Sequence, residues 1–481
     1  MKYESVIGLE VHAQLLTDSK IFCGCSTQFG QDPNHNACPV CTGFPGVLPV
    51  LNKRVVEWAV KAGLATHCKI APASVLARKN YFYPDLPKGY QISQYENPIC
   101  TGGFVDLEVN ASAKRVRLTR IHLEEDAGKS IHDAHGNASL VDLNRAGVPL
   151  LEIVSEPDMH SSEEAGAYLR TLRAILQYLG ICDGNMEEGS FRCDANVSVR
   201  PEATEKLGTK VEIKNLNSFR AVEKALAFEI ERQVDALTGG GEIVQETRLW
   251  DEQREETRAM RSKESAHDYR YFPEPDLLPL TIDEKWISQI GSTLPELPTA
   301  RKRRYMTDYG LPAYDAELLT ARKDVADYFE NAVKAHGNAK ALSNWIVGDL
   351  FRVLKERRLD EQLYMASWPV PAPLLAKLVQ LIDQGRISGK IAKAVFEQML
   401  DSGKTPEQIV GEQGLEQVSD LSSIEAAVDQ VLSSHRQQVD QYRSGNEKVF
   451  GFLVGQVMKA TQGKANPQKV NEILRGKLRT K

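Results

Sequence analysis

Acidic residues and histidine alternate with aliphatic residues in several short segments near the start of this chain. Glu10 and His12 flank Val11, and Glu152 stands among the branched aliphatic residues of 150–154. The segment 116–125 ends in a pair of acids. Side chains two positions apart in a β-strand share a face. We therefore expect Glu10 and His12 on the polar face of a strand whose other face is apolar.

Two further segments repeat this alternation with other charged groups. Residues 192–199 place Arg192, Asp194, Asn196 and Ser198 on one side, and residues 210–214 alternate in the same way. If these strands pair, one face of the sheet carries carboxylates, imidazole, amide and cationic groups together. An ordinary solvated face has no histidine or paired acids, so this face is suited to a divalent metal and a phosphate.

The residues best placed for a hard cation are Glu10, His12, Glu125 and Glu152. Magnesium prefers a few carboxylates together with phosphate oxygens of a substrate. Regular alternation lets only one of Glu124 and Glu125 face His12, and we choose Glu125. The alternative for any single member is a solvated acid, but Glu10 and Glu152 lie in segments that are otherwise apolar.

Four cysteines form the sharpest local pattern in the chain. Cys23 and Cys25 are followed, after twelve intervening residues, by Cys38 and Cys41. Two close pairs allow four thiolates to converge tetrahedrally on Zn²⁺, and four protein ligands leave no open position for catalysis. The pattern therefore predicts a structural zinc site, with four free thiols as the alternative.

Composition places the chain among ordinary soluble proteins. Its 481 residues are 42% hydrophobic and 26% charged, with a net charge of −6. No apolar run approaches the roughly 20 residues of a membrane span, and the N-terminus has no signal-peptide pattern. We therefore expect a cytoplasmic protein with reduced cysteines and no membrane partner. Residues 445–481 carry eight Lys/Arg against two Glu, which indicates an anionic partner at this end or a solvated helical tail.

The fold expected is α+β, with strands and a few helices up to about residue 290 and helices beyond. Amphipathic patterns predict early helices over 53–65, 161–179 and 219–237. Later helices are predicted over 324–334, 339–359, 373–384, 390–399, 424–442, 447–462 and 467–478. A proline-rich stretch, 272–298, marks a boundary. We expect domains at 1–292, 293–407 and 408–481, and the second boundary is the softer one.

Other motifs are less decisive. Gly128-Lys129-Ser130 resembles the end of a phosphate-binding P-loop, but Leu123 stands where the motif requires its first glycine. The segments 79–85 and 268–275 combine aromatic rings with Lys or Arg and end near proline. Such segments can stack a nucleobase or hold phosphate, and they can equally be structural packing. No Ser-His-Asp triad or activated cysteine is recognisable.

Taken together, these segments resemble the B subunits of the aspartyl/glutamyl-tRNA(Asn/Gln) amidotransferases. The segments that carry the resemblance are residues 6–12, 78–85, 124–129, 143–150, 187–190, 192–196, 214–219, 268–275 and 451–456. They extend over essentially the whole chain, and they are long and specific.

The resemblance implies a cradle domain around an antiparallel sheet, similar to glutamine synthetase, followed by an all-α domain and a small α-helical tail that touches tRNA. It implies ATP-dependent activation of the side-chain carboxylate of mischarged Glu-tRNA(Gln) or Asp-tRNA(Asn), then amidation. Ammonia would come from glutamine through a partner amidase, the A subunit, in a heterotrimer completed by a small C subunit. The non-discriminating synthetase is a further partner. The cysteine quartet occurs in only part of this family, so zinc would not be essential to the chemistry.

On this resemblance we assign the expected roles of individual residues. The expected catalytic residues are Glu10, His12, Glu125, Glu152 and Lys79, of which the first four would hold Mg²⁺. The expected ATP-binding residues are Lys79, Tyr81, Ser190, Arg192, Asp194, Asn196, Lys214 and Asn215.

Two other functions remain open at this stage. An ATP-dependent ammonia ligase acting on a free small acid would need no basic tail. A zinc-stapled RNA-binding scaffold would need no cluster of Glu10, His12 and Glu152.

Overall fold

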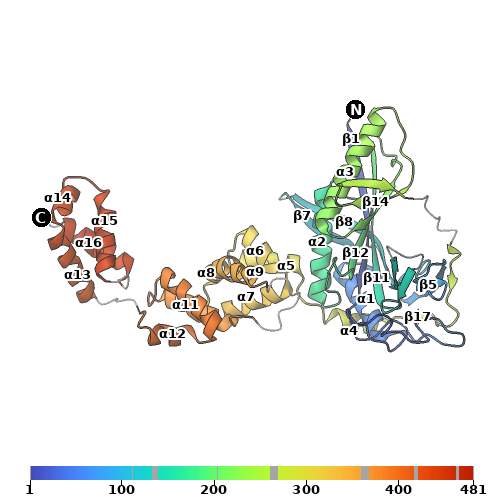
Figure 1. The fold of residues 1–481 in the computed structure, drawn as a ribbon, viewed down its shortest axis with the longest axis horizontal. Helices are drawn as coiled ribbons and strands as arrows, with labels where there is room; N and C mark the ends of the chain where they lie inside the picture. The colour runs from blue at the N-terminus through green and yellow to red at the C-terminus, as the bar shows by residue number, and fades with distance from the viewer. Residues whose placement is uncertain are drawn as a thin grey trace. The chain divides into compact units, whose positions relative to one another are not determined.

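The structure is a computed structural model that describes residues 2–110, 112–132, 139–202, 204–260, 269–358, 368–416, 421–461 and 465–479. It divides into two compact units, Met1–Ala300 and Arg301–Lys481 (Figure 1). Asp268, Leu359, Gln462, Lys464 and Lys481, which belong to segments discussed above, lie outside the described residues. Among the described helices, none has the length and apolar character needed to cross a membrane.

The first unit is built on a ten-stranded sheet. Its main path runs β15-β14-β13-β12-β1-β11-β8-β6-β2, and β7 also pairs with β8. Their bounds are β1 Tyr3–Gln14, β2 Lys69–Ile70, β6 Cys100–Thr101, β7 Phe104–Val109, β8 Ser112–Glu125, β11 Pro149–Ser155, β12 Phe191–Pro201, β13 Val211–Leu216, β14 Thr247–Asp251 and β15 Glu256–Ala259. The described pairs are antiparallel except β13 with β14, which is parallel. The α+β expectation is therefore confirmed, but the sheet is mixed rather than wholly antiparallel.

Helices cover the apolar face of this sheet. They are α1 (Lys53–Ala65), α2 (Ser162–Leu179) and α3 (Phe219–Thr238), while α4 (Glu284–Gly291) packs on α1. Figure 1 shows α2 and α3 running alongside the strands. Leu9, Val11, Leu123, Ile153 and Val197 lie in one buried core with residues of these helices. Because this face is dry, the polar side chains between these aliphatic residues must lie on the other face.

Smaller sheets lie in the same unit. A three-stranded sheet has the order β16-β4-β5, with bounds β16 Phe272–Pro273, β4 Ala77–Asn80 and β5 Tyr90–Ser93. Two strand pairs are β17 (Leu280–Thr281) with β3 (Ala73–Ser74), and β10 (Ser139–Asp142) with β9 (Lys129–His132). The three-stranded sheet brings the two aromatic segments predicted at 79–85 and 268–275 into contact, because β16 pairs with β4.

The second unit is helical in its described residues. Its helices are α5 Pro298–Asp308 (which begins at the unit boundary), α6 Ala313–Thr320, α7 Lys323–Ala335, α8 Ala339–Asn344, a π-helical segment Trp345–Leu350, α9 Phe351–Glu356, α10 Ala372–Asp383, α11 Gly389–Ser402, α12 Pro406–Glu412, α13 Leu421–Ser434, α14 Arg436–Arg443, α15 Val449–Ala460 and α16 Pro467–Arg479. The helix predicted over 424–442 is two helices that meet at His435.

The last four helices have a hydrophobic core of their own. Val428, Leu453, Val457 and Leu474 are fully buried in it. The domain boundary predicted at 407/408 falls inside α12, which packs on α10 and α11. The division into three domains stays a prediction, and α12 belongs with the helices that precede it.

A capping interaction fixes the start of α2, and it provides a test of the fold. The Ser161 hydroxyl accepts a hydrogen bond from the Glu164 backbone N–H, whereas Ser162 is the first residue of the helix. We expect Ser161→Ala to lower the free energy of unfolding by about 1 kcal/mol and the control Ser162→Ala to change it far less. Urea denaturation followed by far-ultraviolet circular dichroism compares the two. Equal midpoints for both variants would contradict this assignment.

Candidate active site and cysteine cluster

Strand register brings the predicted polar residues onto one face of the sheet. His12 on β1 lies opposite Glu152 on β11, and Glu152 lies opposite His122 on β8. On the other side of β1, Glu10 lies opposite Asp194 of β12. Directly opposite residues in antiparallel strands place their side chains on the same face. Four strands thus contribute to a continuous polar face, as the alternation predicted.

Five side chains at the centre of this face form what we call the acid cluster: Glu10, His12, His122, Glu124 and Glu152. Glu152 Oε2 lies 3.4 Å from His12 Nε2 and 3.4 Å from His122 Nε2. His122 Nε2 also lies 3.1 Å from Glu124 Oε1. The potential ligand atoms fall into two sets of three, Glu10–His12–Glu152 and His122–Glu124–Glu152, each within 4.8 Å. Glu152 belongs to both sets.

The electrostatics of the acid cluster follow from its burial. Burial and the neighbouring Glu152 raise the pKa of Glu10 to about 7. Burial alone would lower the pKa of His122, but Glu152 and Glu124 outweigh it and raise that pKa to about 9. The two imidazoles likewise hold the pKa of Glu152 well below its usual range, against the effect of burial. Protons on histidine therefore balance the carboxylates here, and a divalent cation would displace those protons.

The choice of Glu125 over Glu124 is wrong in this structure. Glu124 lies two residues after His122 and shares its face, so Glu125 points to the other side of β8. Gln91 Nε2 and Ser93 Oγ donate to Glu124 at 3.0 Å and 2.6 Å. Glu125 instead accepts from the Ile92 N–H at 2.8 Å and pairs with Lys88.

Besides Glu124, the member of the acid cluster that the sequence reasoning missed is His122. The sequence contained a pattern that could have identified it, because His122 and Glu124 are a histidine and a glutamate two residues apart, like Glu10 and His12. Glu125 with Lys88, by contrast, lines a cavity of about 190 Å³ beside the cysteine loop.

Lys79 reaches the acid cluster from β4. Glu124 and Glu152 raise the pKa of Lys79, although burial opposes this. Its ammonium lies 4.9 Å from the centre of the Tyr269 ring and 5.9 Å from that of Tyr81. Lys79 is therefore a fixed positive charge between an aromatic wall and the acids, whereas Tyr81 contributes its ring to that wall.

The residues predicted on β12 and β13 divide into two groups. Arg192, Asp194, Asn196 and Lys214 lie on the polar face, where Asp194 pairs with Lys214. The buried Oδ1 of Asn196 has no hydrogen-bond partner among the described residues. Ser190 and Asn215 instead stabilise local backbone, because their side chains donate to Asn185 O at 3.0 Å and Trp250 O at 3.0 Å.

Asp126 orients Arg192 and was not predicted as a site residue. Arg192 donates to both Asp126 oxygens, at 2.9 Å and 3.1 Å, and Gln14 Nε2 donates to Asp126 at 2.7 Å. Arg192 and nearby Arg145 lower the pKa of Asp126, against the effect of its burial. The buried Asp126 carboxylate thus holds the Arg192 guanidinium at the edge of the polar face.

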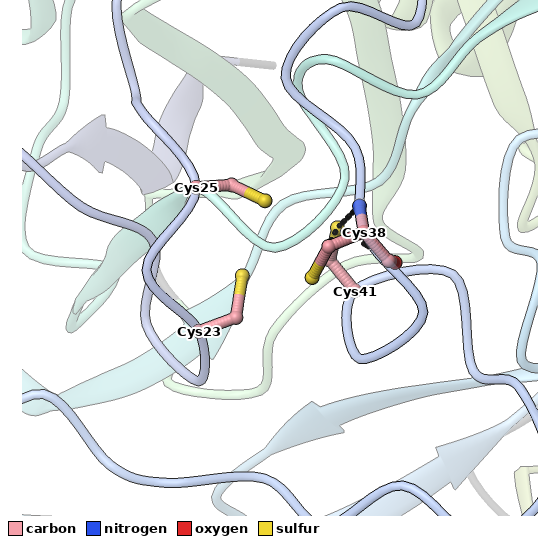
Figure 2. Close-up of side chains that lie close together, drawn as sticks. All are labelled: Cys23, Cys25, Cys38 and Cys41. Atoms are coloured by element: carbon pink, nitrogen blue, oxygen red, sulfur yellow. Dashed lines mark hydrogen bonds between the residues drawn. The ribbon is translucent and has the colours of Figure 1, made fainter.

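The four predicted cysteines converge. Their sulfur atoms lie within 4.8 Å of one another, and Figure 2 shows Cys23 and Cys25 facing Cys38 and Cys41 from a separate loop. The Cys38–Cys41 sulfur separation is 3.8 Å, which suits thiolates around a tetrahedral Zn²⁺ with bonds of about 2.3 Å.

Buried polar groups around the cysteine cluster favour the thiolate of Cys41. Lys20 is 1% exposed, and its ammonium lies 3.6 Å from Cys41 Sγ and donates to Asn36 O at 2.6 Å. The Cys38 N–H donates to Cys41 Sγ at 3.2 Å. A hydrogen bond from Cys23, with the charge of Lys20, lowers the pKa of Cys41 to about 4, whereas the same hydrogen bond and burial raise the pKa of Cys23. The donor set and its surroundings fit a structural metal site.

Comparison with known proteins covers nearly the whole chain. Residues 5–288 match the family model described as the GatB/GatE catalytic domain, and residues 327–478 match the one described as the GatB domain. A relative from Geotalea uraniireducens is 60% identical over 99% of this chain and 100% of its own length. A relative from Geobacter sulfurreducens is 59% identical over 100% of both chains, and one from Carboxydothermus hydrogenoformans is 56% identical over 99% of both chains.

All three relatives are named as the B subunit of an aspartyl/glutamyl-tRNA(Asn/Gln) amidotransferase. The two domain models together match well over half of the chain, and the full-length identities near 60% extend over the residues between them. The chain belongs to the family of aspartyl/glutamyl-tRNA(Asn/Gln) amidotransferase B subunits.

Proposed function

We propose that this chain phosphorylates the side-chain carboxylate of mischarged Glu-tRNA(Gln) or Asp-tRNA(Asn) with ATP and then amidates it. The observation that carries the proposal is the acid cluster. It contains two sets of three potential metal ligands that share Glu152, and Lys79 lies beside them. Carboxylates and imidazoles beside a fixed ammonium suit a nucleotide triphosphate with its cations.

The chemistry explains why ATP is consumed. A carboxylate is a poor acyl donor at neutral pH because oxide is a poor leaving group. In the proposed reaction a carboxylate oxygen attacks the γ-phosphorus, the bond to the β–γ bridging oxygen breaks, and ADP leaves. Ammonia then attacks the carbonyl carbon, phosphate leaves with the former carboxylate oxygen, and the nitrogen loses a proton to give the amide.

The residues of the polar face have distinct roles in this proposal. Glu10, His12 and Glu152 would hold one Mg²⁺, and His122 and Glu124, together with Glu152, would offer ligands for a second. When bound, Mg²⁺ neutralises the charge that develops on the transferring phosphoryl oxygens. Lys79 stabilises the same oxygens as a fixed cation. Arg192, Asn196 and Lys214 contact ATP from β12 and β13, with Arg192 oriented by Asp126.

The proposed assembly supplies what the chain does not carry. Ammonia comes from the glutaminase, or A, subunit, and the small C subunit joins the two in a heterotrimer. The tRNA substrates, with the non-discriminating synthetase, complete the set of partners. The first unit acts as a cradle similar to glutamine synthetase, and the basic tail holds the tRNA backbone. A ligase for a free acid would need no such tail, and an RNA scaffold would need no acid cluster.

The acid cluster should carry the phosphoryl-transfer step. We expect Glu152→Gln to lower ATP cleavage dependent on mischarged tRNA by a factor of at least about 10² to 10³, the usual effect of removing one transition-state stabilising group. Glutamine hydrolysis by the partner amidase should persist at its basal level. Glu156→Gln, at a half-buried residue that accepts a hydrogen bond from Thr119, is the matched control. Near-wild-type ATP cleavage in Glu152→Gln would place the reaction elsewhere.

The cysteine cluster should hold one zinc ion per chain. We expect Cys38→Ser to lose the metal and to lower the thermal unfolding temperature, because the loop then loses its tetrahedral cross-link. Cys68→Ser, at a buried cysteine outside the cluster, should keep the metal. Elemental analysis of protein purified without chelator measures both. A wild-type protein that contains no zinc would refute the site.

The tail should contribute to tRNA binding and not to chemistry. We expect deletion of 421–481 to raise the KM for mischarged tRNA strongly and to leave the KM for ATP unchanged. Replacing exposed Lys448 and Lys459 with Gln should reduce the slope of log Kd against log salt by about 1 for each phosphate that is no longer neutralised. Lys285→Gln, on α4, is the control for a change in charge. An unchanged tRNA affinity after the deletion would reject this role.

A further inference from the structure

A second cavity adjoins the three-stranded sheet of the first unit. Its volume is about 370 Å³, and we call it the aromatic pocket. Its polar and aromatic lining residues are Tyr95, Glu96, Asn97, Arg270, Tyr271 and Phe272, and Val75, Ala77 and Pro273 complete the wall. Three aromatic rings, one guanidinium, one amide and one carboxylate thus surround a space that none of the roles proposed above uses.

The rings of the aromatic pocket form a stacking platform. Tyr95 and Tyr271 are stacked, with ring centroids 4.3 Å apart and planes inclined by 9°. Tyr95 is 41% exposed and Phe272 is 44% exposed. Exposed rings beside arginine are the combination by which proteins bind unpaired nucleotides, because every base has a face that can stack. A purely structural cluster would bury its rings instead.

The aromatic pocket is connected to the acid cluster. Tyr271 lies 6.1 Å from Tyr269, centre to centre, and Tyr269 lies under the Lys79 ammonium. Ala77 and Lys79 lie two residues apart on the same face of β4, a separation of roughly 7 Å. A ligand that contacts Ala77 in the pocket therefore lies one such separation, about 7 Å, from Lys79.

Arg120 makes a second connection. Its Nη1 donates to Tyr95 O at 3.2 Å, and Arg120 precedes His122 by two residues on β8, so the two side chains share a face. Arg270 thus lines the pocket, and Arg120 contacts the backbone of one of its lining residues, Tyr95. These charges are complementary to a phosphate backbone that passes the pocket.

The position of the aromatic pocket separates it from the ATP contacts proposed on β12 and β13. In the sheet, β12 and β13 lie on one side of β1 and β11, whereas β8 lies on the other. Phosphoryl donor and acceptor must approach the transferred group in line from opposite sides. A pocket on the β8 side is therefore placed for the substrate that carries the carboxylate.

We propose that the aromatic pocket seats the 3′-terminal adenosine of the tRNA, with its base against the Tyr95–Tyr271 stack. This inference rests on the proposed function, since every tRNA ends in an adenosine to which the amino acid is esterified. The Asn97 amide pairs with the N6 and N7 edge of the adenine, as asparagine does elsewhere. The aminoacyl group then extends from the ribose toward Lys79 and the acid cluster.

The test compares Tyr95→Leu, which removes the aromatic face, with Tyr95→Phe, which keeps it. Tyr314→Leu, at an exposed tyrosine of the second unit, is the matched control. Each variant is assembled with its partner subunits, and KM is measured for mischarged tRNA and for ATP. We expect Tyr95→Leu to raise the KM for tRNA about ten-fold, the effect of losing one stacked base, with the KM for ATP unchanged. Tyr95→Phe and Tyr314→Leu should match the wild type.

A second measurement removes the base instead of the ring. Binding of uncharged tRNA is compared with binding of the same tRNA lacking its terminal adenosine. The wild type should bind the complete tRNA about ten-fold more tightly, and Tyr95→Leu should bind both equally. A rise in KM for ATP alone would assign the pocket to the adenine of ATP and overturn the proposal. Unchanged constants for both substrates would also overturn it. Failure of the proposed function is distinguishable, because the wild type would then cleave no ATP in response to mischarged tRNA.

Discussion

The Glu152 carboxylate, shared between His12 and His122, is the interaction on which the site depends. Each of the three residues lies on a different strand, and the register of β1, β11 and β8 sets them in one row. A shift of one residue in any of these pairings would turn that side chain into the core. The apolar residues that alternate with them are fully buried under α1, α2 and α3, so core packing fixes the register and thereby the site.

Burial gives the polar face its chemical character. His122 is 1% exposed and Glu124 is 3% exposed, so their charges interact through little water. Uncompensated charges at this depth would be costly, and three of the charged groups on this face have a neutralising partner. Asp126 neutralises Arg192, Asp194 neutralises Lys214, and the imidazoles neutralise Glu152. The remaining carboxylates of the acid cluster lie beside Lys79. A divalent cation bound there would displace protons from the cluster.

The cysteine loop stabilises the same unit from another direction. Buried Lys20 donates to Asn36 O and to Leu143 O, at 2.6 Å and 3.2 Å, and its ammonium faces Cys41. One ammonium therefore joins the cysteine cluster to the segment that leads into β11, the strand of Glu152. The zinc site we propose would affect catalysis by stabilising the segment that leads to Glu152. It would not bind the substrate, because all four of its ligands are cysteines.

Short-range rules predicted much of this structure. The helix over 53–65 has the predicted bounds, because apolar spacing and an asparagine cap both mark it. The polar face was predictable because strand alternation is local, and the cysteine cluster because its two pairs are close in sequence. The choice of Glu125 over Glu124 failed because the alternation was not followed along β8 from His122. Glu124, two residues after His122, shares its face.

Features that depend on distant partners were not predictable. The parallel pairing of β13 with β14 joins segments separated by helix α3, and nothing in either segment specifies its direction. Asp126 has a role only because β12 brings Arg192 to it. The Tyr95–Tyr271 stack joins residues far apart in the chain, so the aromatic segments could be interpreted only as stacking or as packing until β16 was seen to pair with β4.

The central claim is that the side-chain carboxylate is itself phosphorylated on this polar face. Mischarged tRNA carrying ¹⁸O in both side-chain carboxylate oxygens tests this directly, in the assembled enzyme with ATP and glutamine. The account predicts that each inorganic phosphate released carries one ¹⁸O atom, because the acyl phosphate breaks at the carbonyl carbon when ammonia attacks. Phosphate without the label, or the label in AMP, would contradict it.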